Sequence, residues 1–200
     1  KSAHVKLVTD AVAELHKSDF SKVVLSRTKR VACKLEIAGW LGALADAYPQ
    51  NCVFLFSTKA NGMWMGATPE VLLQKHQNTV AANSLAGTRL ATKSGNWGAK
   101  ELEEQAIVTK SIIETFADFG VENIKTDGPK TKTSGPVAHL FTEVSGQIAA
   151  NKNAIDLAKK LHPTPAVGGL PQGRAITFIR ERENYNRQFY TGFFGVEENE

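Results

Sequence analysis

Hydrophobic residues recur along the chain at two spacings, one typical of helices and the other of strands. The helical spacing of three to four residues places side chains on one face, as Val5, Val8 and Val12 do near the N-terminus. Val108 and Ile112 follow the same spacing in the middle of the chain. The pattern predicts helices over residues 2–18, 37–48, 100–119, 153–161 and 172–183.

Between these helices, β-branched and aromatic runs or alternating hydrophobic and polar residues predict strands. Asn61-Gly62 separates two such runs and indicates a hairpin. Polar residues 91–98 and 120–135 predict surface loops. Consecutive strands among helices predict an α/β (α+β) layered sandwich, with mixed or antiparallel sheets flanked by helices. We expect strands over residues 22–31, 52–58, 62–67, 141–149 and 187–195, and two more between 71 and 85.

Composition narrows the class of protein. Two hundred residues with 42% hydrophobic content suit one globular domain, residues 1–200, with a sizeable core. The net charge is +4, but the basic residues are dispersed rather than gathered in a stripe with aromatic residues, so we expect no nucleic-acid partner. No hydrophobic run approaches membrane-spanning length, and we expect no membrane association. We expect a cytoplasmic monomer.

The two cysteines, Cys33 and Cys52, lack the spacing of a zinc site or a disulfide framework. Both lie in apolar runs, so we expect buried thiols of a reducing compartment.

The segment LHPTPAVGGLP, residues 161–171, is the most constrained in the sequence. Three prolines and two glycines in eleven residues exclude a continuing helix or a central strand. An ordinary connection between two helices is one interpretation. A rigid loop whose backbone N–H groups can reach a small anionic ligand is the other. We expect His162 to orient this loop.

This segment resembles the signature loop of the chorismate-utilising enzymes, in the form carried by isochorismate synthases. Six other motifs agree with it in order, and together they cover residues 20 to 196. They are KVVLSR (22–27), GATPEVLL (66–73), SLAGTR (84–89), KELEEQAIV (100–108), AHL (138–140) and the segment 190–195.

The resemblance implies a Mg²⁺-dependent isomerase that converts chorismate to isochorismate. It makes Lys22 the general base that deprotonates the attacking water, and Glu70 the general acid that protonates the departing hydroxyl from the other side of the ring. The ammonia-using members of the family lack this lysine, which favours water as the nucleophile. Without the resemblance, Lys22 is a solvated lysine at a strand start and Glu70 a surface carboxylate.

The resemblance also assigns substrate-binding residues. Gly87 and Thr88 lie in a small-residue turn that we expect at a strand end, and the family uses the matching positions to contact the substrate. His139 is either a site residue near the reacting hydroxyl or a core side chain satisfied by hydrogen bonds. Ala166 is the substrate-contact candidate of the signature loop.

Acidic residues crowd the start of the helix predicted over 100–119, where the helix dipole favours them without any metal. Mg²⁺ nevertheless takes one or two carboxylates together with water and substrate oxygens. The family pattern assigns the Mg²⁺ ligand to Glu104. The family often has a histidine directly after this glutamate, where the chain has Gln105.

In the family, further strands follow residues 187–195 and carry a substrate-binding arginine, a second Mg²⁺ glutamate and a late lysine, none of which has a counterpart here. We therefore expect a fragment that lacks the C-terminal strands and an N-terminal portion. We expect these residues alone to bind Mg²⁺ and chorismate weakly and to turn nothing over. Two alternatives remain, a salicylate synthase and a non-catalytic chorismate binder. The menaquinone and siderophore routes are not distinguished by sequence.

Overall fold

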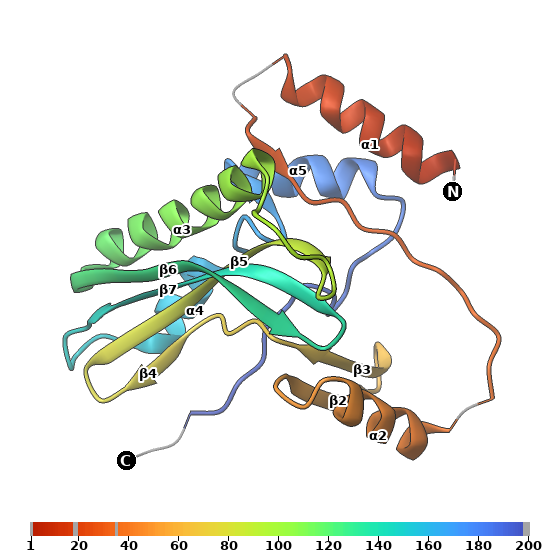
Figure 1. Cartoon of the computed structure of the whole chain (residues 1–200), viewed down its shortest axis with the longest axis horizontal. Coiled ribbons are helices and arrows are strands. Elements are labelled where there is room, and N and C mark those ends of the chain that lie inside the picture. The colour runs from red at the N-terminus through yellow and green to blue at the C-terminus, as the bar shows by residue number, and fades with distance from the viewer. Residues whose placement is uncertain (1, 18–19, 35, 198–200) are drawn as a thin grey trace. The chain divides into compact units, whose positions relative to one another are not determined.

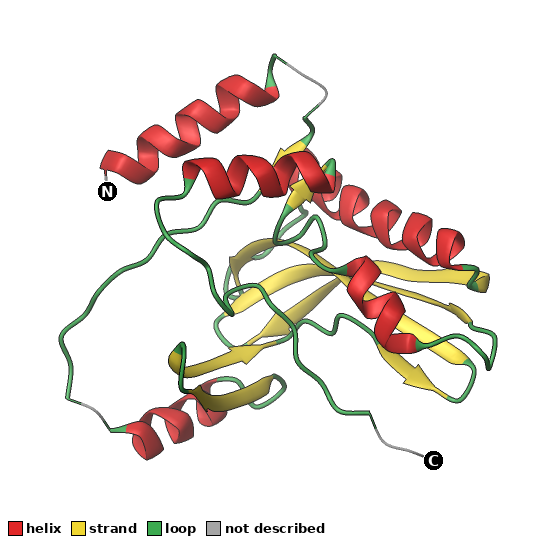
Figure 2. Cartoon of the chain, turned by 180° about the vertical axis from the view of Figure 1, so that it is seen from behind, coloured by secondary structure: helices red, strands yellow, loops and turns green. Residues whose placement is uncertain are grey.

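The computed structural model describes residues 2–17, 20–34 and 36–197. The chain forms two compact units, one from residues 30–152 and one from residues 1–29 and 153–200. Figure 1 labels the elements along the chain, and Figure 2 shows the same elements from behind. Both units combine helices with antiparallel strands, which confirms the predicted fold class.

The unit of residues 30–152 contains a four-stranded antiparallel sheet in the order β4-β5-β7-β6. Its central ladder joins β5 to β7, from Thr79↔Gln147 to Leu90↔Val137. Burial alternates along β7, as expected of a strand with one covered face. The strands are β4 (Gln74–His76), β5 (Thr79–Leu90), β6 (Glu122–Ser134) and β7 (Val137–Gln147).

Helix α3 (Ala99–Phe119) lies along one face of this sheet (Figures 1 and 2). Val108, Ile112 and Phe116, at the predicted helical spacing, are each at most 1% exposed. Burying such side chains stabilises the unit by roughly 1.5–3 kcal/mol each. The helix ends at Gly120, whose φ of +80° allows the left-handed cap.

The same unit contains helix α2 (Ile37–Ala47) and the hairpin of β2 (Cys52–Thr58) and β3 (Gly62–Thr68). Both strands and the Asn-Gly turn agree with the prediction. The side chains of Asn51 and Ser134 donate hydrogen bonds to each other, over 2.9 and 3.1 Å. These bonds tie the start of the hairpin to the end of β6.

The second unit pairs two short strands, β1 (Lys22–Val23) and β8 (Gly169–Leu170), which are antiparallel. It also contains helices α1 (Ser2–Leu15), α4 (Ala154–Leu161) and α5 (Gln172–Arg182). α5 contacts both strands, and its residues Ala175 and Ile179 are buried. Asn153 caps α4 by accepting a 2.7 Å hydrogen bond from the N–H of Ile155.

Three predictions of local structure are wrong. The strand predicted over 22–31 stops at Val23, because its partner β8 has only two residues. The loop predicted over 120–135 is instead the edge strand β6, paired with β7. Residues 188–191 form turns, with bonds such as Tyr190 N–H to Arg187 O, and no ladder pairs the described part of the 187–195 segment.

Two other expectations are also corrected. Cys33 and Cys52 are exposed, because Cys33 lies in an unpaired exposed loop and Cys52 points outward at the start of β2. The segment 84–89 does not end a strand, because β5 continues through it to Leu90. Among the described residues, no helix is long and apolar enough to cross a membrane.

Candidate active site

Three predicted site residues lie together on the β5–β7 ladder. Thr88 and His139 are direct partners across it, and the Thr88 Oγ1 atom lies 3.1 Å from Nδ1 of His139. The same nitrogen lies 3.2 Å from the carbonyl oxygen of Gly87. The pairing of the two strands therefore brings together residues that are about fifty positions apart in the sequence.

The contacts assign the tautomer of His139. A backbone carbonyl only accepts hydrogen bonds, so Nδ1 carries the hydrogen that it donates to Gly87 O. Burial lowers the pKa of His139, and the hydrogen bond to Gly87 offsets part of that effect. The ring is therefore mainly neutral at pH 7, and its Nε2 atom is a hydrogen-bond acceptor.

The backbone conformation at position 87 favours glycine. Its φ is +63°, and the register of the ladder shifts between Ala86 and Thr88. A Cβ atom added at Gly87 would lie 3.2 Å from Cβ of Glu101 and 3.5 Å from the Trp97 ring. The bulge therefore lets the first turn of α3 approach β5 closely.

Glu104, the predicted Mg²⁺ ligand, lies in the same part of α3. Its side chain is 34% exposed, and its Oε1 atom lies 3.7 Å from Nζ of Lys100. No cluster of three metal-ligating side chains occurs within residues 2–17, 20–34 and 36–197. A half-exposed carboxylate still fits Mg²⁺, which commonly takes one or two protein carboxylates and completes its shell with water and substrate oxygens.

Gln105, at the position where the family often has histidine, is 2% exposed. Its Nε2 atom donates to the carbonyl oxygen of Ser84 and to Oγ1 of Thr142, each over 3.0 Å. Its Oε1 atom is buried without a hydrogen-bond partner. Gln105 therefore ties the start of α3 to both central strands of the sheet.

Glu70 follows β3 and Pro69 and is half-buried. Its backbone N–H donates a 3.2 Å hydrogen bond to Oγ1 of Thr68, which fixes the backbone turn that carries the carboxylate.

In the other unit, Lys22 is the first residue of β1 and is half-buried. The ladder of β1 and β8 is extended on both sides, by Ser21 N–H to Leu170 O over 2.9 Å and by Val24 N–H to Gly168 O over 2.8 Å. The backbone of Lys22 is therefore tied directly to the end of the signature loop.

The signature loop is held by bonds within itself and to the C-terminal segment. Thr164 O accepts from the N–H groups of Val167 and Gly168, over 3.1 and 3.0 Å. Nε2 of His162 donates to the carbonyl oxygen of Thr191 over 2.9 Å. The orienting role of His162 stays a prediction. Ala166 lies at the half-buried turn of this loop.

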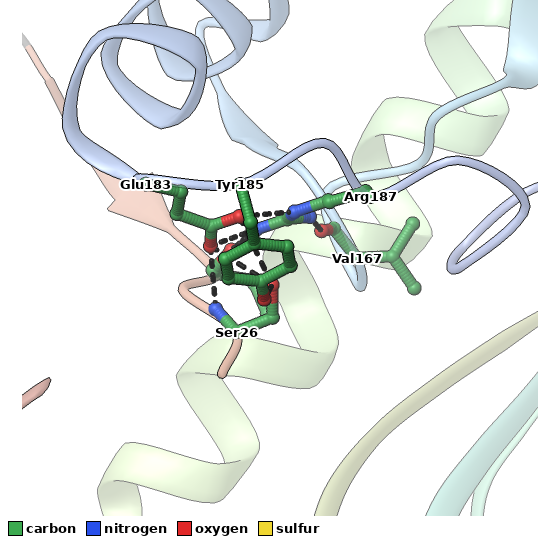
Figure 3. A network of polar contacts seen from close by, with 6 residues as sticks. Ser26, Val167, Glu183, Tyr185 and Arg187 are labelled. Atoms are coloured by element: carbon green, nitrogen blue, oxygen red, sulfur yellow. Dashed lines mark hydrogen bonds and ion pairs between the residues drawn. The ribbon is translucent and has the colours of Figure 1, made fainter. Parts of the chain in front are cut away.

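A buried polar network lies beside these elements, and the sequence did not reveal it (Figure 3). Glu183 and Arg187 form a bidentate ion pair with distances of 2.6 and 2.7 Å. Ser26 donates to the same carboxylate, and its hydroxyl lies 2.6 Å from that of Tyr185. In sequence, a glutamate and an arginine four residues apart are indistinguishable from a surface pair.

The ion pair shifts the pKa values of both its members. Burial acts to raise the pKa of Glu183, but hydrogen bonds from Arg187 and Ser26 outweigh it, and the pKa is lowered. The hydrogen bond with Glu183 raises the pKa of Arg187, against the effect of burial. Both groups therefore stay charged at neutral pH.

The whole chain, residues 1–200, matches a family model described as "Chorismate binding enzyme". It is 32% identical to the isochorismate synthase MenF of Bacillus subtilis, over 98% of the chain and 44% of that protein. It is also 32% identical to the vibriobactin-specific isochorismate synthase of Vibrio cholerae, over 90% of the chain and 49% of that protein. The chain thus spans about half the length of the curated relatives it matches.

Solved structures agree with the sequence matches. The 2,3-dihydroxybenzoate-specific isochorismate synthase DhbC from Bacillus anthracis is similar with a TM-score of 0.81 and 27% identity, over 93% of the chain and 54% of that structure. Anthranilate synthase component I from Streptococcus pneumoniae shares the fold, with a TM-score of 0.72 and 18% identity over 91% of the chain and 42% of that structure.

Proposed function

We propose that this chain, which belongs to the family of chorismate-binding enzymes, serves in the conversion of chorismate to isochorismate. The observation that carries the proposal is its similarity to isochorismate synthases over nearly its whole length. The presence of Lys22, which the ammonia-using members of the family lack, favours water as the nucleophile.

In the proposed reaction, Lys22 takes a proton from water as the oxygen attacks C2 of chorismate. The ring double bonds shift, and the C4 hydroxyl leaves with a proton from Glu70 as a second water molecule. One water is consumed and one released, so the reaction is an isomerisation. Lys22 and Glu70 then exchange their protons with solvent, which restores the starting state.

His139, Gly87, Thr88 and Ala166 are proposed to hold the substrate. The Nε2 atom of neutral His139 is suited to accept a hydrogen bond from a substrate hydroxyl, which an imidazolium would not do. Glu104 is proposed to hold Mg²⁺, which when bound would neutralise a carboxylate of chorismate.

The test uses the full-length gene product with chorismate and Mg²⁺, and chromatography to separate the products. We expect isochorismate, and its loss in the Lys22→Ala and Glu70→Gln variants. Lys75→Ala, which changes an exposed lysine of β4, is the control. Salicylate as the product would favour the salicylate synthase alternative, and binding of chorismate without turnover would favour the non-catalytic binder.

A further inference from the structure

The carboxylate of Glu183 is buried and saturated with donors. Its side chain is 1% exposed, at the C-terminal cap of α5. It accepts from the backbone N–H of Ser26 over 2.6 Å, from the Ser26 hydroxyl over 2.9 Å, and from two nitrogens of Arg187. Because the bonds to Ser26 cross 157 positions of sequence, this carboxylate fixes the segment that follows β1.

Arg187 uses two of its three remaining donors on backbone carbonyls. Nη2 donates to Val24 O over 2.7 Å, and Nη1 donates to Val167 O over 3.2 Å. Val24 follows β1 directly, and Val167 belongs to the signature loop. One guanidinium therefore holds the two segments together, as its planar fork of five donors allows and a lysine ammonium would not.

The ends of these bonds lie next to proposed site residues. Val24 is two positions after Lys22, and Val167 directly follows Ala166. The N–H of Val24 also donates to Gly168 O of the signature loop. Val24 is therefore tied to the loop directly through its N–H and, through its carbonyl, by way of Arg187. A shift of Arg187 would therefore move both segments relative to each other.

We propose that Arg187 and Glu183 are positioning residues that set the location of the Lys22 amine and of the Ala166 turn. The inference rests on the proposed function, because it assigns a role through Lys22. A buried ion pair adds little net stability compared with apolar residues of similar size, but it fixes geometry, and removing one partner leaves an uncompensated charge.

The main test measures kcat, KM and the pH dependence of kcat/KM for Arg187→Met in the full-length protein. A general base displaced by about 1 Å loses about 100-fold in rate, so kcat should fall by about that factor. KM should rise by a smaller factor than kcat falls, because the displaced Ala166 turn is proposed to contact the substrate, whereas Lys22 acts in the transition state. The acid limb of the pH profile, which reports protonation of the proposed general base, should also move, because the surroundings of that base change with its position.

Arg180→Met is the matched control, because Arg180 is an exposed arginine of α5, the helix that ends directly before Glu183. It should leave kcat, KM and the pH profile unchanged. An Arg187→Met enzyme with the wild-type kcat and pH profile would overturn the proposal.

A double variant separates positioning from folding. Arg187→Met with Glu183→Leu leaves no unpaired buried charge, so it should recover much of the stability lost in Arg187→Met alone. Its kcat should stay about 100-fold low, because the bonds to the two backbone segments are still missing. If kcat recovered together with stability, the ion pair would be only structural.

Hydrogen exchange tests the geometry independently of any activity. In Arg187→Met, the N–H groups of Val24 and Gly168 should exchange faster than in Arg180→Met, while those in the middle of α5 keep their protection. Unchanged exchange at both sites would overturn the proposed positioning. The two proposals can fail separately. If the wild-type protein makes no isochorismate, while Arg187→Met still shows the faster exchange, the proposed function is overturned and the positioning of the two segments stands.

Discussion

The hydroxyl of Thr88 lies 3.1 Å from Nδ1 of His139, and the two residues face each other across the β5–β7 ladder. The bulge at Gly87 adds a carbonyl oxygen 3.2 Å from the same nitrogen. One side of the imidazole is thus fixed by the sheet itself, and the tautomer leaves Nε2 as an acceptor.

His139 should titrate below its ordinary pKa of 6.5, because burial disfavours the charged ring. The folded state then binds the proton more weakly than the unfolded state, so stability is fully present above pH 6.5 and falls as the pH is lowered below that value. Proton NMR should give the lowered pKa directly. Denaturant unfolding of His139→Gln should show a weaker loss of stability on acidification than the wild type, whereas Gln74→Leu, at an exposed position of β4 without a titratable group, should follow the wild type.

Gly87→Ala should destabilise the protein by about 1–2 kcal/mol, because an alanine is strained at a φ of +63°. The added Cβ also meets Glu101 at 3.2 Å, so α3 must shift slightly. Gly42→Ala in α2 is the control, since nothing lies within 4 Å of its Cβ position, and it should be stabilising by up to about 1 kcal/mol. Equal stabilities of the two variants in denaturant would contradict the assigned conformation.

Gln105→Leu should cost about 1–3 kcal/mol, because the carbonyl of Ser84 and the hydroxyl of Thr142 lose their common donor. Loss of the unpartnered Oε1 atom works in the opposite direction and limits the effect. Gln74→Leu, at an exposed site of β4, should change the free energy of unfolding by less than about 0.5 kcal/mol. A neutral Gln105→Leu variant would show that α3 does not depend on this side chain for its attachment.

Removal of Mg²⁺ by a chelator should abolish isochorismate formation, and added Mg²⁺ should restore it. Glu104→Gln should raise the Mg²⁺ concentration for half-maximal activity by about 10-fold or more. Replacing a residue that only hydrogen-bonds to a metal ligand already lowers metal affinity by about that factor. Glu103→Gln, which changes the exposed neighbouring carboxylate, should leave the Mg²⁺ dependence unchanged. Identical titration curves for the two variants would remove Glu104 from the proposed metal site.

Both cysteines should react with a thiol reagent in the native protein, because Cys33 and Cys52 are exposed. Titration without denaturant should therefore modify both thiols, and denaturation should expose no further reactive thiol. A thiol that reacts only after unfolding would contradict the exposed positions.

The elements that the sequence determined are those whose signal is local. Helices α2, α3, α4 and α5 follow from hydrophobic residues at helical spacing, and the β2–β3 hairpin follows from two apolar runs around Asn61-Gly62. The resemblance also named Gly87, Thr88 and His139. Their roles remain predictions.

Tertiary structure decided what depends on distant partners. Strand β6 is almost entirely exposed and polar, so its sequence carries no alternation, and only pairing with β7 makes it a strand. The contact of Thr88 with His139 exists because β5 and β7 are paired in that register. Glu183 and Arg187 are spaced like a surface ion pair, and only the approach of Ser26, Val24 and Val167 buries them. A local pattern fixes which element a segment can form, whereas hydrogen-bond partners and burial depend on chain segments that come together only in the fold.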